Sequence, residues 1–187
     1  EGDFEGPQSE RSMLLTVLAT VLTCVPSSRP GILIRSDSLT DLYVGGKTWT
    51  EFFETAKARK DVWRDNYDAG IPDPDLVARA NAVAGRWRLL AVAEDWCSDS
   101  VNTVPFLARL AEAVPGLELR IVNSAAGRWV MEAHRTPDGR AATPIIVLID
   151  ETGREAGCFI ERPASLQDWF REQKPKLDAD ELQKQKM

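Results

Sequence analysis

Two short and almost continuous apolar runs constrain the fold of this chain more than any other feature. The runs are WRLLAVA at 87–93 and IIVLI at 145–149. A strand covered by helices on both faces reads as an unbroken apolar run, whereas a strand with one face in water alternates apolar and polar residues. The sequence therefore predicts a sheet whose central strands are covered on both sides.

The segments around these two runs indicate how such a sheet is connected. In chain order, hydrophobic spacing and turn residues predict a strand at 87–93, a helix at 99–114, a strand at 117–122, a helix at 125–134, strands at 145–149 and 154–160, and a helix at 166–172. The order β-α-β-α-β-β-α favours an α/β fold with a central mixed four-stranded sheet flanked by helices.

Two further helices are predicted before the first apolar run. Thr48 and Glu51 form the pattern of a capping box, which predicts a helix over 49–66. The Asp-Pro pair at 73–74 is a typical helix start, and this second helix runs to residue 85. The chain thus divides into four parts: a leader at 1–36, a helical extension at 37–85, the α/β domain at 86–173 and a charged tail at 174–187.

The leader contains an apolar run, LLTVLATVLTCV, at 14–25. This run is too short to cross a bilayer as a helix, but its length suits the hydrophobic region of a signal peptide. The residues before it carry one arginine against four carboxylates, which is a poor start for an export signal. We therefore expect a cytoplasmic protein, with export as the alternative.

The composition argues against several classes of partner. Lys and Arg number 23 against 29 Asp and Glu, so the formal net charge is −6. Nucleic acids and anionic membranes select basic surfaces, so we expect neither as a partner. The one histidine and three scattered cysteines also lack the spacing of a metal site. We expect a monomer without a metal or a cofactor.

Cys97 is the candidate reactive residue. It lies in the segment EDWCSDS at 94–100, between the first buried strand and the next predicted helix. The free N–H groups and the positive dipole end of a helix favour a thiolate, and Ser100 could add a hydrogen bond to the sulfur. The negative charge of Asp99 opposes the thiolate. The alternative is that Cys97 is an inert, half-buried apolar residue.

The pattern around Cys97 resembles the thioredoxin superfamily. The matching residues are Trp96 and Cys97 before a helix, Pro105 within that helix, and Thr143 and Pro144 before a later strand. The resemblance covers 87–172 and implies that the Thr143–Pro144 bond is cis and faces Cys97. Within the superfamily, the chain is similar to a bacterial thioredoxin-like group with a helical N-terminal extension.

The chain departs from this family pattern at two important positions. Ser100 stands where the resemblance implies a second cysteine, so the motif is C-x-x-S, and Ala91 replaces a buried acid. A mixed disulfide on Cys97 therefore cannot be resolved by a neighbouring thiol. Strand geometry places Cys158 roughly 10–13 Å from the expected site, which is too far for a disulfide, and we expect it in the core. We assign Cys24 no role.

For four other polar residues, a structural role fits the sequence better than a functional one. We expect His134 to be a partly exposed histidine at a helix end rather than a base for Cys97. Glu94 and Asp95 fit solvated carboxylates better than proton carriers. Arg162 fits a surface turn better than the edge of a substrate groove.

Two functions of different classes remain open. The first is a monothiol thiol-disulfide oxidoreductase in which Cys97 and Ser100 are catalytic and Trp96, Thr143 and Pro144 form the substrate groove. Its partners would be a protein thiol or disulfide, or a small thiol such as glutathione. The alternative is a non-catalytic module that uses the same groove to bind an extended peptide or a protein.

Overall fold

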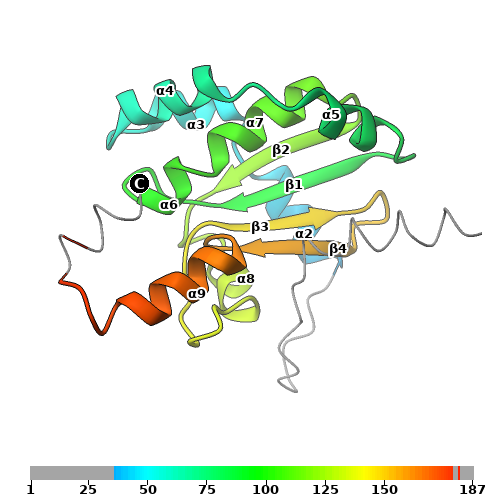
Figure 1. Ribbon diagram of the computed structural model, residues 1–187. Helices are drawn as coiled ribbons and strands as arrows, with labels where there is room; N and C mark the ends of the chain where they lie inside the picture. Colours follow the sequence, from blue (N-terminus) through cyan, green and yellow to red (C-terminus); the bar gives the residue numbers. More distant parts are fainter. Residues whose placement is uncertain (1–35, 179–180, 182–187) are drawn as a thin grey trace, which may run out of the picture.

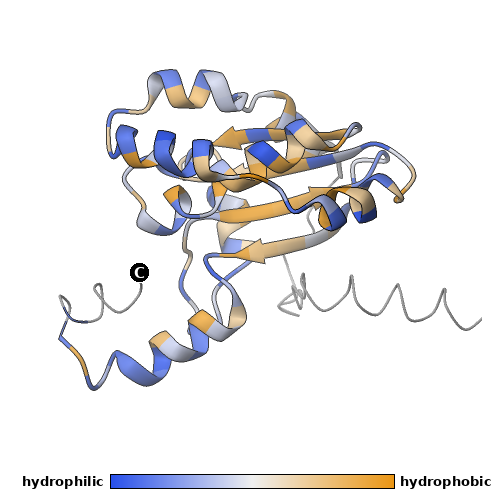
Figure 2. Ribbon diagram, turned by 45° about the horizontal axis from the view of Figure 1, so that its top comes forward, coloured by the Kyte–Doolittle hydropathy of each residue, from blue (hydrophilic) through white to orange (hydrophobic). Residues whose placement is uncertain are grey.

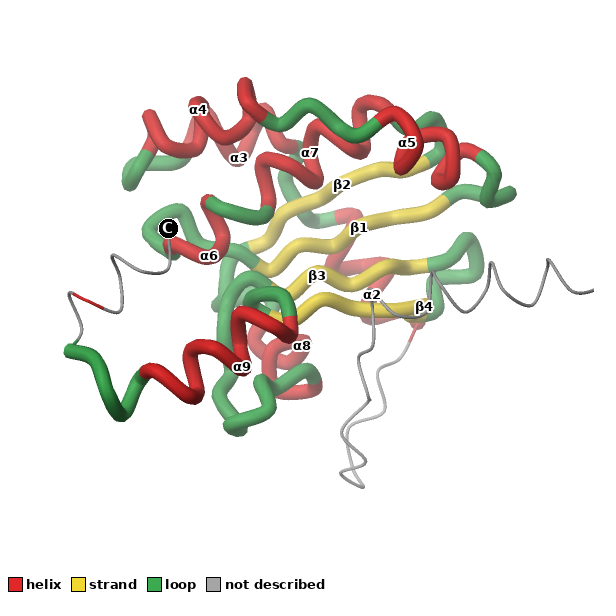
Figure 3. The backbone as a smooth tube through the Cα atoms, in the orientation of Figure 1, coloured by secondary structure: helices red, strands yellow, loops and turns green. Residues whose placement is uncertain are grey.

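The computed structural model describes residues 36–178 and residue 181, and its centre is one four-stranded sheet (Figure 1). The strands are β1 (Trp87–Val92), β2 (Leu117–Val122), β3 (Ile145–Ile149) and β4 (Glu155–Ile160), in the spatial order β2-β1-β3-β4. β1 is parallel to β2 and antiparallel to β3, and β3 is antiparallel to β4, as the arrows in Figure 1 show. Figure 3 shows the four strands side by side. The predicted α/β class and mixed sheet are confirmed. The leader, Cys24 and most of the tail lie outside the described residues.

Both faces of the sheet are covered, as the apolar runs predict. Leu90 and Val92 of β1 pack in one core with α2 (Ser36–Val44) and α8 (Arg128–Ala133). Leu89 and Ala91 point to the other face, where the second core includes residues of α4 (Lys60–Ala69) and α7 (Val104–Ala113). Figure 2 shows the apolar strands enclosed by helices of mixed polarity. Strand periodicity therefore supplies apolar residues to two cores at once.

The helical extension contains two helices where the sequence predicts one over 49–66. The capping box at Thr48 is present, but α3 (Trp49–Thr55) stops before α4 begins, and Arg59 between them has a φ of 53°. The predicted single helix at 49–66 is wrong because two backbone N–H groups between the helices, those of Lys57 and Ala58, donate to the Asp95 carboxylate instead. A side chain distant in sequence thus ends a helix that local propensity would continue.

The extension also covers the edge of the sheet. Lys47 and Ile121 exchange two backbone hydrogen bonds of 2.8 Å, which forms a short bridge beside β2. The approach is so close that a Cβ atom on Gly46 would lie 2.9 Å from Cβ of Arg120. Glycine at 46 therefore allows the chain to pair with an edge strand that would otherwise be open.

The helix after Cys97 is also broken, contrary to the single helix predicted at 99–114. The structure has α6 (Ser98–Val101) and α7 (Val104–Ala113), with two residues between them. Pro105 has no N–H to donate to the carbonyl of Val101, four residues earlier. That carbonyl accepts a 2.8 Å hydrogen bond from Nδ2 of Asn66 in α4 instead. The extension thus satisfies a group that the proline leaves unpaired.

The remaining helices lie close to their predicted positions. They are α5 (Pro74–Asn81) in the extension, α8 (Arg128–Ala133) and α9 (Ala164–Gln173). Gly127 begins α8 where a Cβ atom would lie 2.6 Å from Val92, so the helix can approach β1 closely. Within the described part of the chain, none of the helices combines the length and apolar character needed to span a bilayer.

Candidate thiol site

Cys97 lies where the end of β1 meets the start of β3. Val92, the last residue of β1, pairs with Ile145, the first residue of β3, so the segments beyond them are neighbours. The Cys97 thiol donates a hydrogen bond to the Thr143 carbonyl, with 3.3 Å between Sγ and O. The Thr143–Pro144 peptide bond is cis. These contacts bring three of the sequence-predicted site residues together.

Cys97 and the preceding Trp96 differ in their solvent exposure. Cys97 is half-buried and is a free cysteine, while the Trp96 side chain is 62% exposed. The Cys97 N–H donates to the Glu94 carbonyl at 3.1 Å, which fixes the turn before α6. Cys97 is the N-cap of α6, but that helix has four residues instead of the long helix expected from the sequence. Cys97 is therefore a partly exposed residue at the start of a tight turn.

Ser100 is fully buried and faces the loop before Cys97. Its Oγ accepts a 3.5 Å hydrogen bond from the Glu94 N–H. The hydrogen bond expected between Ser100 and the Cys97 sulfur is not among the contacts of the described residues. In this structure, Ser100 holds the turn that carries the cysteine.

Asp99 is paired with Arg162, which corrects the expectation that Arg162 lies in a plain surface turn. The Asp99 Oδ2 accepts a 2.6 Å hydrogen bond from Arg162, and both side chains are nearly buried, at 11% and 12% exposed. Arg162 is therefore not part of a plain surface turn, and the negative charge of Asp99 has a counter-charge beside it. A buried carboxylate requires such a partner because its desolvation is costly.

The ion pairs continue from Arg162 to the segment before the cis peptide. Glu161 bonds Arg162 at 3.0 Å and takes two further bonds, each 3.0 Å, from Arg140. Arg140 also donates to Asp138 at 2.7 Å, which is the main reason that the pKa of Asp138 is lowered to about 2. The Glu161 N–H donates to the Pro144 carbonyl at 2.7 Å. The network thus joins α6 to both sides of the cis-proline loop.

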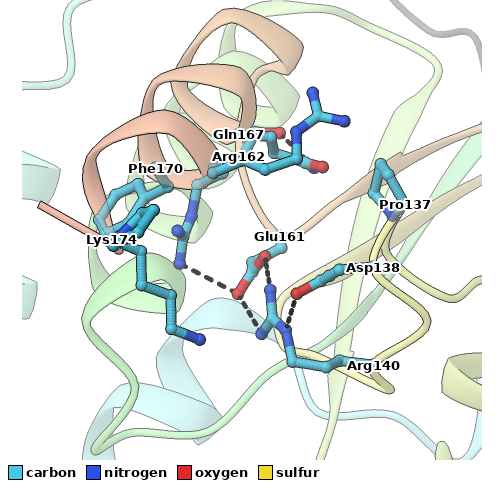
Figure 4. Close-up of a pocket in the computed structure, with 10 residues that line it drawn as sticks. Pro137, Asp138, Arg140, Glu161, Arg162, Gln167, Phe170 and Lys174 are labelled. Atoms are coloured by element: carbon cyan, nitrogen blue, oxygen red, sulfur yellow. Dashed lines mark hydrogen bonds and ion pairs between the residues drawn. The ribbon is translucent and has the colours of Figure 1, made fainter.

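A pocket of about 520 Å³ opens beside this network (Figure 4). Its lining residues are Pro137, Asp138, Arg140, Glu161, Arg162, Gln167, Phe170, Arg171, Lys174 and Pro175. The Phe170 ring lies against Arg162, with 4.0 Å between Cζ and the ring centre. A cation held against an aromatic face has a fixed orientation, so the pocket wall is ordered on this side.

The two carboxylates before Cys97 organise loops and are not simply solvated. Glu94 accepts hydrogen bonds from the N–H and the hydroxyl of Ser124, at 2.8 and 2.5 Å. The Lys57 N–H, together with that of Ala58, lowers the pKa of Asp95 below its ordinary value. The Asp95 carbonyl accepts a 2.9 Å bond from the buried Trp63 indole. Both acids therefore have structural partners at neutral pH.

His134 is buried, which corrects the prediction of a partly exposed histidine. Its Nδ1 bonds the Val130 carbonyl at 2.9 Å and its Nε2 bonds Glu155 at 2.8 Å. Burial lowers the pKa of His134, but the Glu155 carboxylate and the Val130 carbonyl outweigh it, and the net pKa is raised. The ring packs at the far part of β4 and does not touch Cys97 in any contact of the described residues.

One group of side chains has the composition of a metal site. Ligand atoms of His134, Glu155 and Cys158 lie within 4.8 Å of one another. Cys158 is in a disulfide bond, however, and the His134 ring is already hydrogen-bonded to Glu155. Cys158 is buried opposite Val147, so its predicted place in the core is confirmed. This cluster is part of the protein interior and not of the thiol site.

Sequence reasoning missed Asn66 and Arg140 and underestimated Arg162. The pairing of Ile160 with Ile145 brings the end of β4 beside the cis-proline loop. The position of Arg162 shortly after β4 was therefore a signal that this residue lies near the site. No comparable signal marks Asn66, because its partner is a backbone carbonyl 35 positions away.

The chain is similar to proteins of one known family. The sequence model of the family described as Thioredoxin matches residues 46–177. Among solved structures, a protein of unknown function from Pseudomonas aeruginosa has a TM-score of 0.60 and 22% identity, over 73% of this chain and 84% of that one. An HIV epitope scaffold has a TM-score of 0.59 and 25% identity, over 70% of this chain and 82% of the other. A comparison with curated proteins found no match. Because the family model covers more than half of the sequence, the protein belongs to the thioredoxin family.

Proposed function

We propose that the protein exchanges thiols and disulfides through Cys97 alone. The observation that carries this proposal is the half-exposed, free Cys97 thiol, whose sulfur lies 3.3 Å from the Thr143 carbonyl beside the cis peptide. In this proposal, the exposed Trp96, which precedes Cys97, and the cis-proline loop provide the surface for a substrate. The residue one turn further on is Ser100, which cannot form a disulfide.

The reaction has two balanced steps. In the first, the Cys97 thiolate attacks a substrate disulfide, forms a mixed disulfide with one sulfur, and displaces the other as a thiolate that takes up a proton from solvent. In the second, an external thiolate attacks the substrate sulfur of the mixed disulfide, which releases the Cys97 thiolate. Each step breaks one S–S bond and forms another, so no electron acceptor besides the thiols and disulfides is required.

The surrounding residues have supporting roles in this proposal. Ser100 holds the turn through Glu94, and the Asp99–Arg162 pair keeps an uncompensated negative charge away from the thiolate. Ala91 is fully buried in the core at the position where the family pattern has an acid. No carboxylate therefore lies at that position to move a proton, and we expect the exchange to be slow.

The test is the formation and release of a mixed disulfide. The full chain is mixed with glutathione disulfide, and intact mass spectrometry follows the addition of one glutathionyl group. We expect this adduct in the wild type and in Ser100→Ala, its loss in Cys97→Ser, and its removal by reduced glutathione. Absence of the adduct from the wild type, or an adduct that reduced glutathione does not release, would overturn the proposal.

A second candidate is a non-catalytic binding module that uses the same groove. It is favoured by Ala91 at the position where the family pattern has a buried acid, because this alanine cannot assist exchange and, being fully buried, does not alter the exposed surface around Trp96. This function requires that peptide binding survive the Cys97→Ser substitution unchanged. It also requires that the wild type form no adduct, so the same mass measurement separates the two functions.

A further inference from the structure

We propose that Glu161 is a positioning residue for the exchange reaction at Cys97. Its buried carboxylate and its backbone N–H hold the cis-proline loop and the helix α6 in a fixed relation, so that a substrate meets the sulfur and the loop at the same time. This inference rests on the proposed function, because it assigns a residue outside the groove to the same reaction. Glu161 acts through its neighbours and not by contact with the sulfur.

The backbone of Glu161 has a conformation that is uncommon for any residue except glycine. Its φ is 59°, in the left-handed region, where glycine is the usual residue and a glutamate is strained. Gln167 holds the backbone on both sides, since its amide donates to the Ile160 and Arg162 carbonyls at 2.7 and 3.0 Å. In this conformation the Glu161 N–H donates to the Pro144 carbonyl at 2.7 Å. The strained residue therefore lies directly against the loop of the thiol site.

The Glu161 side chain is buried although it is an acid. The residue is 5% exposed, and its carboxylate lies between Arg140, which donates two bonds of 3.0 Å, and Arg162, which donates one (Figure 4). The bond to Glu161 is the main reason that the pKa of Arg140 is raised. Buried ions often stabilise a fold no better than apolar residues of similar volume. A strained backbone and a buried charge at one position therefore indicate a role beyond stability.

Glu161 connects the two segments that meet at the Cys97 sulfur. Through Arg162 it is joined to α6, the helix that Cys97 begins. Through Arg140 and its own N–H it holds the chain on both sides of Thr143. The Sγ of Cys97 lies 3.3 Å from the Thr143 carbonyl, where these two segments meet. The contacts thus form a closed ring that starts and ends at the sulfur.

This ring matters only for a substrate that contacts both segments. A peptide disulfide that lies on the cis-proline loop is attacked well only if the loop and the Cys97 thiolate keep one relative position. A small disulfide contacts the sulfur alone and does not depend on that position. Loss of the Glu161 carboxylate should therefore slow exchange with a peptide and spare exchange with a small reagent.

The experiment compares two such reagents on the full-length protein at neutral pH. The first is a short alanine–serine peptide whose central cysteine carries a 2-thiopyridyl group. The second is methyl 2-pyridyl disulfide, which has the same leaving group without the peptide. Attack by the Cys97 thiolate forms a mixed disulfide and releases 2-thiopyridone, which takes up a proton and is followed by its absorbance. We expect the wild type to react faster with the peptide.

The central variant is Glu161→Gln, which keeps the shape of the side chain and removes its charge. We expect it to slow the peptide reaction by about tenfold and to change the methyl reaction by less than about twofold. A milder variant, Arg140→Lys, keeps the charge but loses the two-bond contact, and should slow the peptide reaction by about threefold. The control is Glu155→Gln, a paired acid at the other end of β4, which should change neither rate.

A spectroscopic measurement reports the same role without any reaction. The Raman difference between the wild type and Cys97→Ser contains the S–H stretching band of Cys97, which a hydrogen bond to the Thr143 carbonyl displaces. We expect Glu161→Gln to move and broaden this band toward that of an unbonded thiol, and Glu155→Gln to leave it in place. An unchanged band in Glu161→Gln would overturn the positioning role.

Two kinetic outcomes would also overturn it. If both variants slow the two reagents equally or slow neither, Glu161 does not relate the loop to the sulfur. If Glu161→Gln instead speeds the methyl reaction, the substitution has opened the fold around Cys97, and the role of Glu161 is structural only.

The positioning role and the proposed function fail in different ways. If the Raman band moves as expected but the wild type forms no mixed disulfide with glutathione, the exchange function is wrong and the control of the thiol contact by Glu161 stands. If the glutathione adduct forms and is released but Glu161→Gln leaves the band and the peptide rate unchanged, the exchange function stands and the positioning role is wrong.

Discussion

Asp99 and Arg162 are 63 positions apart in the sequence, yet their side chains meet at 2.6 Å behind the thiol site. Asp99 belongs to the short helix that Cys97 begins, and Arg162 is the second residue after the end of β4. Each is nearly buried, so each makes the burial of the other possible. The pair fixes the position of the motif helix relative to the far edge of the sheet.

Loss of one partner of this pair should destabilise the fold strongly. We expect Arg162→Met to lower the free energy of unfolding by about 3 kcal/mol, because a buried carboxylate is left without its counter-charge. Asp99→Asn should cost less, since Arg162 keeps Glu161 as a partner. Urea denaturation of the single and double variants should give a coupling of about 1–3 kcal/mol.

A matched control for this experiment is the exposed pair of Arg64 and Asp61, whose atoms lie 3.2 Å apart. Arg64→Met should change stability by less than about 0.5 kcal/mol, because water screens exposed charges. If Arg162→Met costs no more than Arg64→Met, the buried pair does not stabilise the site.

The hydrogen bond from Asn66 to the Val101 carbonyl should be needed only because Pro105 is present. We expect Asn66→Ala to cost about 1–2 kcal/mol, since it leaves a partly buried carbonyl unpaired. In a Pro105→Ala background, the new N–H at 105 can reach the Val101 carbonyl, and the same substitution should cost clearly less. Thermal denaturation of the four variants checks this, and equal costs in both backgrounds would contradict it.

The Ser100→Cys substitution tests the geometry of the motif helix. We expect a disulfide between positions 97 and 100 under oxidising conditions, because the two residues are one turn apart. The variant should gain insulin-reducing activity, but slowly, because Ala91 supplies no base to activate the attacking thiol. Free-thiol counts and insulin turbidity with dithiothreitol measure the two effects, with Ser100→Ala as the control. Unchanged thiol counts after oxidation would mean that position 100 does not reach the sulfur.

The buried His134–Glu155 pair should make stability depend on pH. Because the folded-state pKa of His134 is raised, the pair contributes fully below the ordinary pKa of 6.5 and loses this contribution as pH rises through the folded value. The unfolding free energy of the wild type should therefore fall as the pH rises above 6.5. Glu155→Gln should remove this fall, whereas Glu151→Gln, on the exposed turn, should retain it. A wild type with constant stability over this range would exclude a charged pair.

The strands were predictable because their signal lies in consecutive residues. The runs at 87–93 and 145–149 are buried on two faces, and the limits of β2 and β3 agree with the predicted segments. The break between α3 and α4 was not predictable, because its cause lies far away in the sequence, whereas the break between α6 and α7 has a local signal in Pro105. Asp95 captures N–H groups 37 and 38 positions earlier, and the residues around that break have ordinary helix propensity.

The thiol site was predicted only in part, because some of its residues belong to local motifs and others depend on contacts between distant segments. Cys97, Thr143 and Pro144 are recognisable as local motifs and lie together. The charged network around Arg162 depends on pairings between three separated segments, none of which has an unusual local sequence. The role of Ser100 likewise depends on the turn that Glu94 completes.

The contacts between the extension and the thiol loop also form in a fixed order during synthesis, because the extension is made first. Trp63 and Asn66 precede the groups that they bond, Asp95 and Val101, by 32 and 35 positions. During synthesis at roughly 5–20 residues per second, the supporting residues leave the ribosome about two to seven seconds before the loop that they position. The Trp63 indole, fully buried in the finished protein, has no partner from the loop during this interval. The rings of Trp49 and Phe52, which precede Trp63, can already pack on the indole at this stage, but the carbonyl that accepts its N–H is the last part of the site to arrive.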